Sequence, residues 1–157
     1  MIQVTAGLAE HHKHCDEDFA VTEETARAGD WDGCESAFRR FRSQMEAHFA
    51  AEEEILFPGL ERRTGTSAGP TRVMRMEHAQ MRSLLDQMDA AMAVRDAVGL
   101  SGTAETLLIM MQQHNLKEEN ILYPMCDRAL AGDADIEARL RQALEVAAAA
   151  APGVARA

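Results

Sequence analysis

Aromatic residues make up only 4% of this 157-residue sequence, and β-branched residues are also few. Both kinds of side chain favour strands, so their scarcity argues against a β-sheet. Alanine, leucine, methionine, glutamate and arginine are abundant instead, and all five are good helix formers. The composition therefore predicts an all-α fold, and the length fits one domain with its own core.

The sequence also lacks a basic cluster, a long apolar run and a closely spaced cysteine pair. Its 16 Lys and Arg residues against 26 Asp and Glu residues give a formal charge of −10, which disfavours a nucleic-acid partner. No uncharged apolar stretch approaches the ~18–20 residues of a membrane span, and no signal-peptide pattern is present. Three widely spaced cysteines suit reduced thiols. We expect a soluble, cytoplasmic protein without a membrane partner.

Gly, Pro and Asp residues divide the chain into helical segments. They predict four long helices, over about residues 5–28, 30–63, 70–98 and 102–130. A shorter amphipathic helix is expected over about residues 134–150, followed by a tail reading APGVARA. Short loops predict an up-down-up-down four-helix bundle with a short additional C-terminal helix. We expect the bundle to span residues 1–130, and the C-terminal helix and tail to span 131–157.

Three of these helices carry a core stripe, meaning residues spaced alternately by three and four positions that face the bundle interior. Unusually, His and Glu residues occur within the stripes. The stripe members are Phe38, Phe41, Met45, His48, Glu52 and Ile55, then Met74, His78, Met81, Leu85, Met88 and Met92, then Ala104, Leu107, Met111, His114, Glu118 and Ile121. The pattern therefore predicts imidazoles and carboxylates inside the bundle.

An internal repeat relates the two halves of the chain. The segments HFAAEEEILFP and HNLKEENILYP share H, E, E, I, L and P in register, at an offset of 66 residues from His48 to His114. The same offset carries His12 onto His78, so each helical hairpin contributes one lone His and one His-x-x-x-Glu pair. Prolines also recur just beyond each pair, at Pro58 and Pro124, and predict a kink or a helix end there.

The repeat also discriminates among the three histidines of EHHKH. His12 lies on the core stripe with Cys15 and Phe19. His14 is about 200° around the helix from His12, so it should face solvent. His11 is about 100° from His12 and corresponds to Glu77 in the second copy, which places it at most at the edge of the stripe.

Burying four imidazoles and two carboxylates without compensation would be costly, so the pattern indicates a metal site. Side chains at positions i and i+4 share a helix face, and two such pairs can meet across a bundle. Six ligands exceed what one tetrahedral zinc needs, which favours two ions. These chemical arguments leave iron, zinc, copper and nickel open. The predicted ligands are His12, His48, Glu52, His78, His114 and Glu118.

This motif order resembles the hemerythrin-like family, also called the hemerythrin HHE cation-binding domain, over about residues 5–128. The resemblance implies a non-haem di-iron centre that binds dioxygen or related small molecules. It implies that the six predicted ligands hold two iron ions, with Glu52 and Glu118 bridging. An oxo or hydroxo bridge between the ions would bring each to about five ligands.

The sequence departs from the oxygen-carrying members of that family. Those members have a His-x-x-x-His pair in the third helix and a His followed five residues later by Asp in the fourth. Here Met74 and Arg82 lie four residues from His78, and His114 pairs with a Glu at i+4. One iron therefore lacks a histidine ligand, which favours an open, reactive or sensory site over reversible oxygen carriage.

Three side chains are candidates to replace that missing ligand. Tyr123 lies close to the second His-x-x-x-Glu pair, and Glu53 and Glu119 each follow a predicted ligand directly. Helical direction points both glutamates away from the core stripe.

Three function hypotheses follow. In the first, the protein binds or senses dioxygen, nitric oxide or peroxide, or holds iron. In the second it is an enzyme that reduces peroxide or nitric oxide or repairs iron centres, although no further acid or base is evident on the stripes. In the third it is a structural bundle with vestigial polar positions, which would be fully stable without metal.

Overall fold

The computed structural model describes residues 3–150, and this range is almost entirely helical. The four long helices are α1 (Ala6–Arg27), α2 (Trp31–Ala51), α4 (Pro70–Ala93) and α5 (Ala97–Lys117). Two short helices, α3 (Phe57–Thr64) and α6 (Tyr123–Ala129), extend α2 and α5, and α7 (Ala134–Ala150) follows them. The predicted all-α bundle with an additional C-terminal helix is confirmed. The tail predicted after residue 150 lies outside the described residues.

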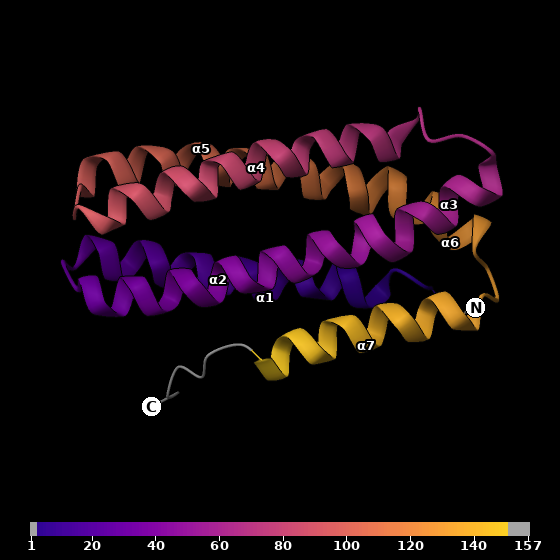
Figure 1. The fold of residues 1–157 in the computed structure, drawn as a ribbon, viewed down its shortest axis with the longest axis horizontal. Helices are drawn as coiled ribbons and strands as arrows, with labels where there is room; N and C mark the ends of the chain where they lie inside the picture. The colour runs from indigo at the N-terminus through magenta and orange to yellow at the C-terminus, as the bar shows by residue number, and fades with distance from the viewer. Residues whose placement is uncertain (1–2, 151–157) are drawn as a thin grey trace.

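The bundle is assembled from two helical hairpins that lie side by side (Figure 1). Helices α1 and α2 form the first hairpin, and α4 and α5 form the second. Helix α7 runs along the outside of the first hairpin, where it packs against α1 and α2. No helix among the described residues is long and apolar enough to cross a membrane.

Each hairpin begins its second helix with the same cap. Asp30 accepts a hydrogen bond from the Gly33 N–H at 3.0 Å, and Asp96 accepts one from the Gly99 N–H at 2.9 Å. Asp is a favoured N-cap because its carboxylate satisfies a free N–H of the first turn. A Cβ at Gly99 would collide with the capping carboxylate, so glycine permits this contact.

The Asp96 cap corrects two predicted helix boundaries. The third long helix ends at Ala93, not near residue 98, and the fourth begins at Ala97, not after Gly102. The break occurs at residues 94–96, where Arg95 adopts a positive φ of 54°. The Ser101-Gly102 pair resembled a breaker in the sequence, but both residues lie inside α5, because capping by Asp96 starts the helix earlier.

A π-helical turn follows each bundle helix that carries a His-x-x-x-Glu pair. These turns are η1 (Glu52–Leu56), between α2 and α3, and η2 (Glu118–Leu122), between α5 and α6. The N–H of Phe57 bonds to the Glu52 carbonyl, five residues back, and the N–H of Tyr123 bonds to the Glu118 carbonyl in the same way. Such turns are rare in proteins, and those that occur are often found at functional sites.

The recurring prolines do not end the helical conformation of the chain. Pro58 and Pro124 each occupy the second residue after a π turn, and the chain remains helical beyond them. Because proline has no N–H, it cannot continue the normal i to i−4 bonding at this point. The predicted helix end is wrong, because the chain stays helical and only its hydrogen bonding changes at this point. The kink stays a prediction.

The π turns also correct the ends of two core stripes. The stripe pattern placed Ile55 and Ile121 inside, but Ile55 is only partly buried and Ile121 is 57% exposed. Leu56 and Leu122 are buried instead, at 0% and 1% exposed. A π turn accommodates one more residue than an α turn, so the inward-facing position moves along by one.

Two apolar clusters fill the bundle and leave a polar layer between them. One cluster contains Phe19, Phe38, Phe41, Leu85, Leu107 and other buried residues toward the α1–α2 and α4–α5 connections. The other contains Leu8, Leu56, Phe57, Leu60, Leu122 and others, including residues of α7. The His and Glu residues of the stripes lie between these clusters along each helix. All three cysteines are buried, free thiols.

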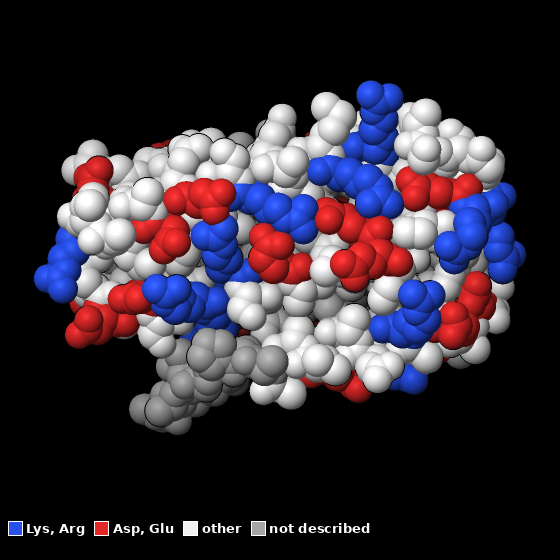
Figure 2. Space-filling model, viewed as in Figure 1, with Lys and Arg blue, Asp and Glu red and all other residues white. Residues whose placement is uncertain are grey.

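Charged side chains are mixed on the face shown in Figure 2, where Lys and Arg residues alternate with Asp and Glu residues. Ion pairs also join different helices, including Arg40 with Asp18 at 2.9 Å and Arg82 with Glu46 at 3.1 Å. This face shows no uniform basic surface of the kind that follows a phosphate backbone.

The shifted stripe predicts different costs for two adjacent truncations. Leu122→Ala should lower the free energy of unfolding by about 2–4 kcal/mol, because it opens a cavity beside a π turn. Ile121→Ala should change it by less than about 1 kcal/mol, because that side chain is mostly exposed. Urea unfolding of both variants measures the difference, and equal losses would contradict the assigned shift.

Candidate metal centre

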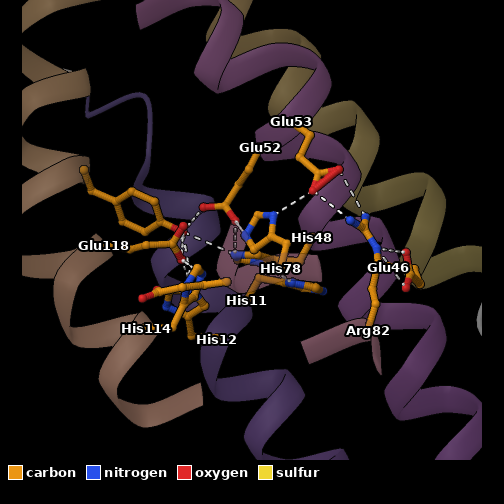
Figure 3. A network of polar contacts seen from close by, with 12 residues as sticks. His11, His12, Glu46, His48, Glu52, Glu53, His78, Arg82, His114 and Glu118 are labelled. Carbon is orange, nitrogen blue, oxygen red and sulfur yellow. Dashed lines mark hydrogen bonds and ion pairs between the residues drawn. The ribbon is translucent and has the colours of Figure 1, made fainter. Parts of the chain in front are cut away.

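The structure brings all six predicted ligands together in the polar layer (Figure 3). They come from different elements, with His12 on α1, His48 on α2, His78 on α4 and His114 on α5. The two glutamates, Glu52 and Glu118, are the first residues of η1 and η2. None of the six side chains is more than 7% exposed.

The four imidazoles direct the same ring atom, Nε2, toward the two carboxylates. His12 and His114 place Nε2 at 3.2 Å and 3.1 Å from Glu118 Oε1. His48 and His78 place Nε2 at 3.4 Å and 3.2 Å from Glu52 Oε1. Four nitrogen donors and two carboxylates therefore converge on one buried volume.

The ligand atoms fall into two groups, each compact enough to surround an ion. The second-hairpin position consists of His78 and His114 with both carboxylates, and its ligand atoms all lie within 4.8 Å of one another. The first-hairpin position consists of His12 and His48 with Glu118, within the same limit. Glu118 belongs to both groups, as expected of a bridging carboxylate.

Several of these atoms fit a cation better than they fit a metal-free core. Glu52 Oε1, Glu118 Oε2, His78 Nε2 and His114 Nε2 are buried without a hydrogen-bond partner among the described residues. Buried polar atoms are nearly always hydrogen-bonded, so four orphans at one place require an explanation. A shared cation supplies one, because imidazole nitrogen and carboxylate oxygen are common metal ligands.

In the second hairpin, the outer nitrogens of both imidazoles are held by carboxylates. His114 Nδ1 lies 2.8 Å from Glu77 Oε1, and His78 Nδ1 lies 2.8 Å from Glu53 Oε2. Lys117 pairs with Glu77, and Arg82 pairs with Glu53 at 2.9 Å. An Nδ1–H that donates to a carboxylate leaves the lone pair on Nε2, the form that binds a metal.

In the first hairpin, His48 is held differently. Its Nδ1 lies 2.9 Å from His11 Nδ1, and His11 Nε2 lies 2.8 Å from Gln44 Oε1. The Gln44 amide then donates to the Ala147 carbonyl of α7 at 3.2 Å. If Gln44 accepts from His11, then His11 accepts from His48, which again leaves the His48 Nε2 lone pair facing the carboxylates.

The last imidazole, His12, has the weakest outer support. Its Nδ1 lies 3.7 Å from Glu119 Oε1, which is beyond hydrogen-bonding distance, and the Glu119 side chain is 39% exposed. The repeat pairs Glu119 with Glu53, so equivalent residues hold the lone histidines of opposite hairpins with different strength.

Tyr123 places a hydroxyl group within the site, on the first-hairpin side. It donates to Glu52 Oε2 at 2.9 Å and lies 3.2 Å from His48 Nε2 and 3.3 Å from His12 Nε2. Its repeat mate is Phe57, whose ring stacks on His78 with centroids 5.8 Å apart. The π turn explains this placement, because it brings the fifth residue after Glu118 around toward the core.

The three candidates to replace the missing fifth imidazole lie in different parts of the site. Tyr123 lies beside His12 and His48, away from the histidine that lacks its neighbour. Glu53 and Glu119 face outer imidazole nitrogens, as helical direction predicted. At the position four residues after His78, Arg82 points to Glu46 and Glu53.

Protonation within the site follows from burial and pairing. Burial opposes charge on His78, but the nearby carboxylates of Glu52 and Glu53 favour the charged form and raise the pKa to about 9. Burial, together with repulsion from Glu118, raises the pKa of Glu52. Burial lowers the pKa of His48 well below its usual value. In metal-free protein Glu52 and His78 therefore hold protons more tightly than they would in water. A metal that binds here must displace these protons.

The six predicted ligands follow from the sequence pattern, whereas most of the residues that contact the outer imidazole nitrogens do not. His14 is exposed, as predicted, but His11 is a buried partner of His48 and more than an edge residue. Glu77 was recorded only as the counterpart of His11. The repeat carried the signal, because Glu77 holds His114 as His11 holds His48.

Comparison with known families agrees with this geometry. Residues 3–126 match the family model described as the hemerythrin HHE cation binding domain. No curated protein and no solved structure matched the chain. The family match covers most of the chain, so the chain belongs to the hemerythrin HHE cation-binding domain family.

The Glu53 contacts predict a pH-dependent contribution to the stability of metal-free protein. Burial alone raises the pKa of this carboxyl group, but hydrogen bonds from His78 and Arg82 lower it to about 2, from 4.5. A lowered pKa stabilises the fold above about pH 4.5, and this contribution is lost as the pH falls toward 2. Glu53→Gln should therefore cost about 1–2 kcal/mol at neutral pH and less in acid.

Urea unfolding of the metal-free wild type and variant, at neutral pH and in acid, measures this difference. The exposed neighbour Glu54 provides the matched control, and Glu54→Gln should change stability by less than about 0.5 kcal/mol at either pH. A Glu53→Gln cost that stays constant across the pH range would contradict the assigned pairing.

Proposed function

We propose that this chain is a non-haem di-iron protein that binds or senses a small molecule such as dioxygen, nitric oxide or peroxide. The observation that carries the proposal is the convergence of four imidazole nitrogens on two buried carboxylates, each of which has one oxygen without a hydrogen-bond partner among the described residues. The proposed ligands are His12, His48, Glu52, His78, His114 and Glu118.

Two ions suit the site better than one. The ligand atoms form two groups, one around His78 and His114 and one around His12 and His48. Glu118 belongs to both groups, and Glu52 Oε1 lies near an imidazole of each, at 3.2 Å and 3.4 Å. We therefore assign both glutamates as bridging ligands. Bound iron would supply redox chemistry and a Lewis acid for a small ligand.

The ligand count supports binding or sensing more than reversible oxygen carriage. A fifth imidazole would have to come from a position four residues from His78, where Arg82 instead pairs with Glu46 and Glu53. The other such position is Met74, which belongs to an apolar cluster. Fewer protein ligands leave more of the coordination sphere to an exogenous molecule. The three buried free thiols support a reducing, cytoplasmic location.

A second candidate function, reduction of peroxide or nitric oxide with an external electron donor, is favoured by Tyr123. Its hydroxyl is a buried O–H group that touches Glu52 and two proposed ligands, so it can hold a proton beside a bound small molecule. Proton delivery at a buried centre requires such a positioned group. Repair of iron centres remains part of the same alternative.

Metal analysis tests the first proposal directly. Protein purified from its native host should contain close to two iron ions per chain, and the oxidised form should show charge-transfer absorption in the near-ultraviolet. His12→Ala should lose iron, whereas His14→Ala, two residues away and exposed, should retain it. Because binding couples to folding, a chelator should also lower the Tm. Metal-replete protein that holds only zinc and stays colourless would overturn the iron assignment.

Tyr123→Phe tests the enzymatic alternative. The phenyl ring should keep the stacking contact with His12, as Phe57 does with His78, so iron content should be unchanged. Turnover of peroxide with an added reductant should fall about 10²-fold or more, the typical contribution of a general acid. If the variant turns over at the wild-type rate, the hydroxyl has no such role.

A further inference from the structure

We propose that the two metal positions differ in affinity, and that the second-hairpin position, at His78 and His114, fills before the first-hairpin position, at His12 and His48. This inference rests on the proposed function, because it concerns the same ligands. It goes further by assigning an order of loading to the two ions and by naming Glu53 and Glu77 as the positioning residues that set it.

More ligand atoms are already gathered at the second-hairpin position than at the first-hairpin position. Around His78 and His114, four atoms from four residues lie within 4.8 Å of one another, including oxygens of both carboxylates. Around His12 and His48, among residues 3–150, only three atoms meet that limit, and Glu118 is the single carboxylate among them. A position with more ligands in place needs less reorganisation when an ion binds.

The two oxygens of the shared carboxylate Glu52 differ in their hydrogen bonding. Its Oε2 accepts a hydrogen bond from the Tyr123 hydroxyl at 2.9 Å, on the first-hairpin side. Its Oε1 has no hydrogen-bond partner among the described residues and lies 3.2 Å from His78 Nε2 and 3.4 Å from His48 Nε2. Glu52 nevertheless groups closely only with the ligand atoms of the second-hairpin position among the described residues. An oxygen that already accepts a hydrogen bond donates less electron density to a metal, so Glu52 favours the second-hairpin ion.

The outer nitrogens, Nδ1, of the second-hairpin imidazoles have charged partners. Both donate to carboxylates at 2.8 Å, His114 to Glu77 and His78 to Glu53. Hydrogen bonds to a charged acceptor are stronger than those to a neutral one. They fix the ring and raise the basicity of the ligating nitrogen. Lys117 and Arg82 keep the two carboxylates in place.

The first hairpin offers weaker support at both equivalent positions. His48 donates to the neutral imidazole of His11, where the repeat has Glu77 in the other half. His12 has Glu119 at 3.7 Å, where the repeat has Glu53 at 2.8 Å. Outer partners of this kind change metal affinity by about 10- to 100-fold. The two positions should therefore differ in Kd by at least about ten-fold.

The test titrates full-length protein, stripped with a chelator, with Fe(II) under anaerobic conditions and separately with Co(II). Calorimetry should resolve two ions binding in two steps, and the cobalt absorption spectrum should report each step independently of activity. Glu53→Gln should weaken the tight step about ten-fold, while the repeat-related Glu119→Gln should leave that step unchanged. His114→Ala should remove the tight step, and His48→Ala the weak one.

Two ions that bind with equal affinity would overturn this inference while leaving the di-metal proposal intact. Loss of the tight step in His48→Ala in place of His114→Ala would also overturn it. Failure of the wild type to bind metal would instead overturn the proposed function. Circular dichroism of each metal-free variant checks folding. If either His variant loses helix, the two Glu→Gln variants, which preserve size and hydrogen bonding, decide the order.

Discussion

The burial of four imidazoles and two carboxylates in one layer is the constraint on which the rest of this structure depends. Each group loses hydration on burial, and a buried charge without a partner costs several kcal/mol or more. Three of the four rings therefore have a polar partner within 2.9 Å of Nδ1, and all four turn Nε2 toward a carboxylate. Two apolar clusters close the layer on either side, so water has little access to it.

The internal repeat supplies the frame for this layer, and differences between its copies supply the chemistry. Caps, π turns and His-x-x-x-Glu pairs recur at the same offset, which makes the two hairpins alike in backbone. The copies differ where Phe57 is matched by Tyr123 and where Glu77 is matched by His11. A symmetric backbone with unlike side chains gives the two proposed metal positions a similar shape and different electrostatics.

Composition predicted the fold class. Periodicity and the internal repeat predicted the six inner residues, because these lie on helix faces, which follow spacing along the chain. Periodicity misplaced the stripe ends, where Leu122 is buried in place of Ile121, because it assumes an unbroken α-helix. The outer partners were harder to predict. Glu53 and Glu77 lie off the stripe, and their contacts depend on how the helices are rotated against one another, which local spacing does not report.

Helix α7 shows how an element outside the metal layer can still act on it. The family match ends at residue 126, before α7 begins, yet the Ala147 carbonyl accepts the amide of Gln44. That contact orients the Gln44 oxygen toward His11, and His11 in turn faces His48. Because an amide oxygen only accepts hydrogen bonds, His11 donates to Gln44 through Nε2 and accepts from His48 through Nδ1. A backbone carbonyl on α7 thus selects the tautomer of His48, a proposed metal ligand, through two intervening side chains. The first-hairpin position thus depends on the docking of α7. The second-hairpin position is supported instead by Glu53 and Glu77, which belong to the four-helix bundle itself.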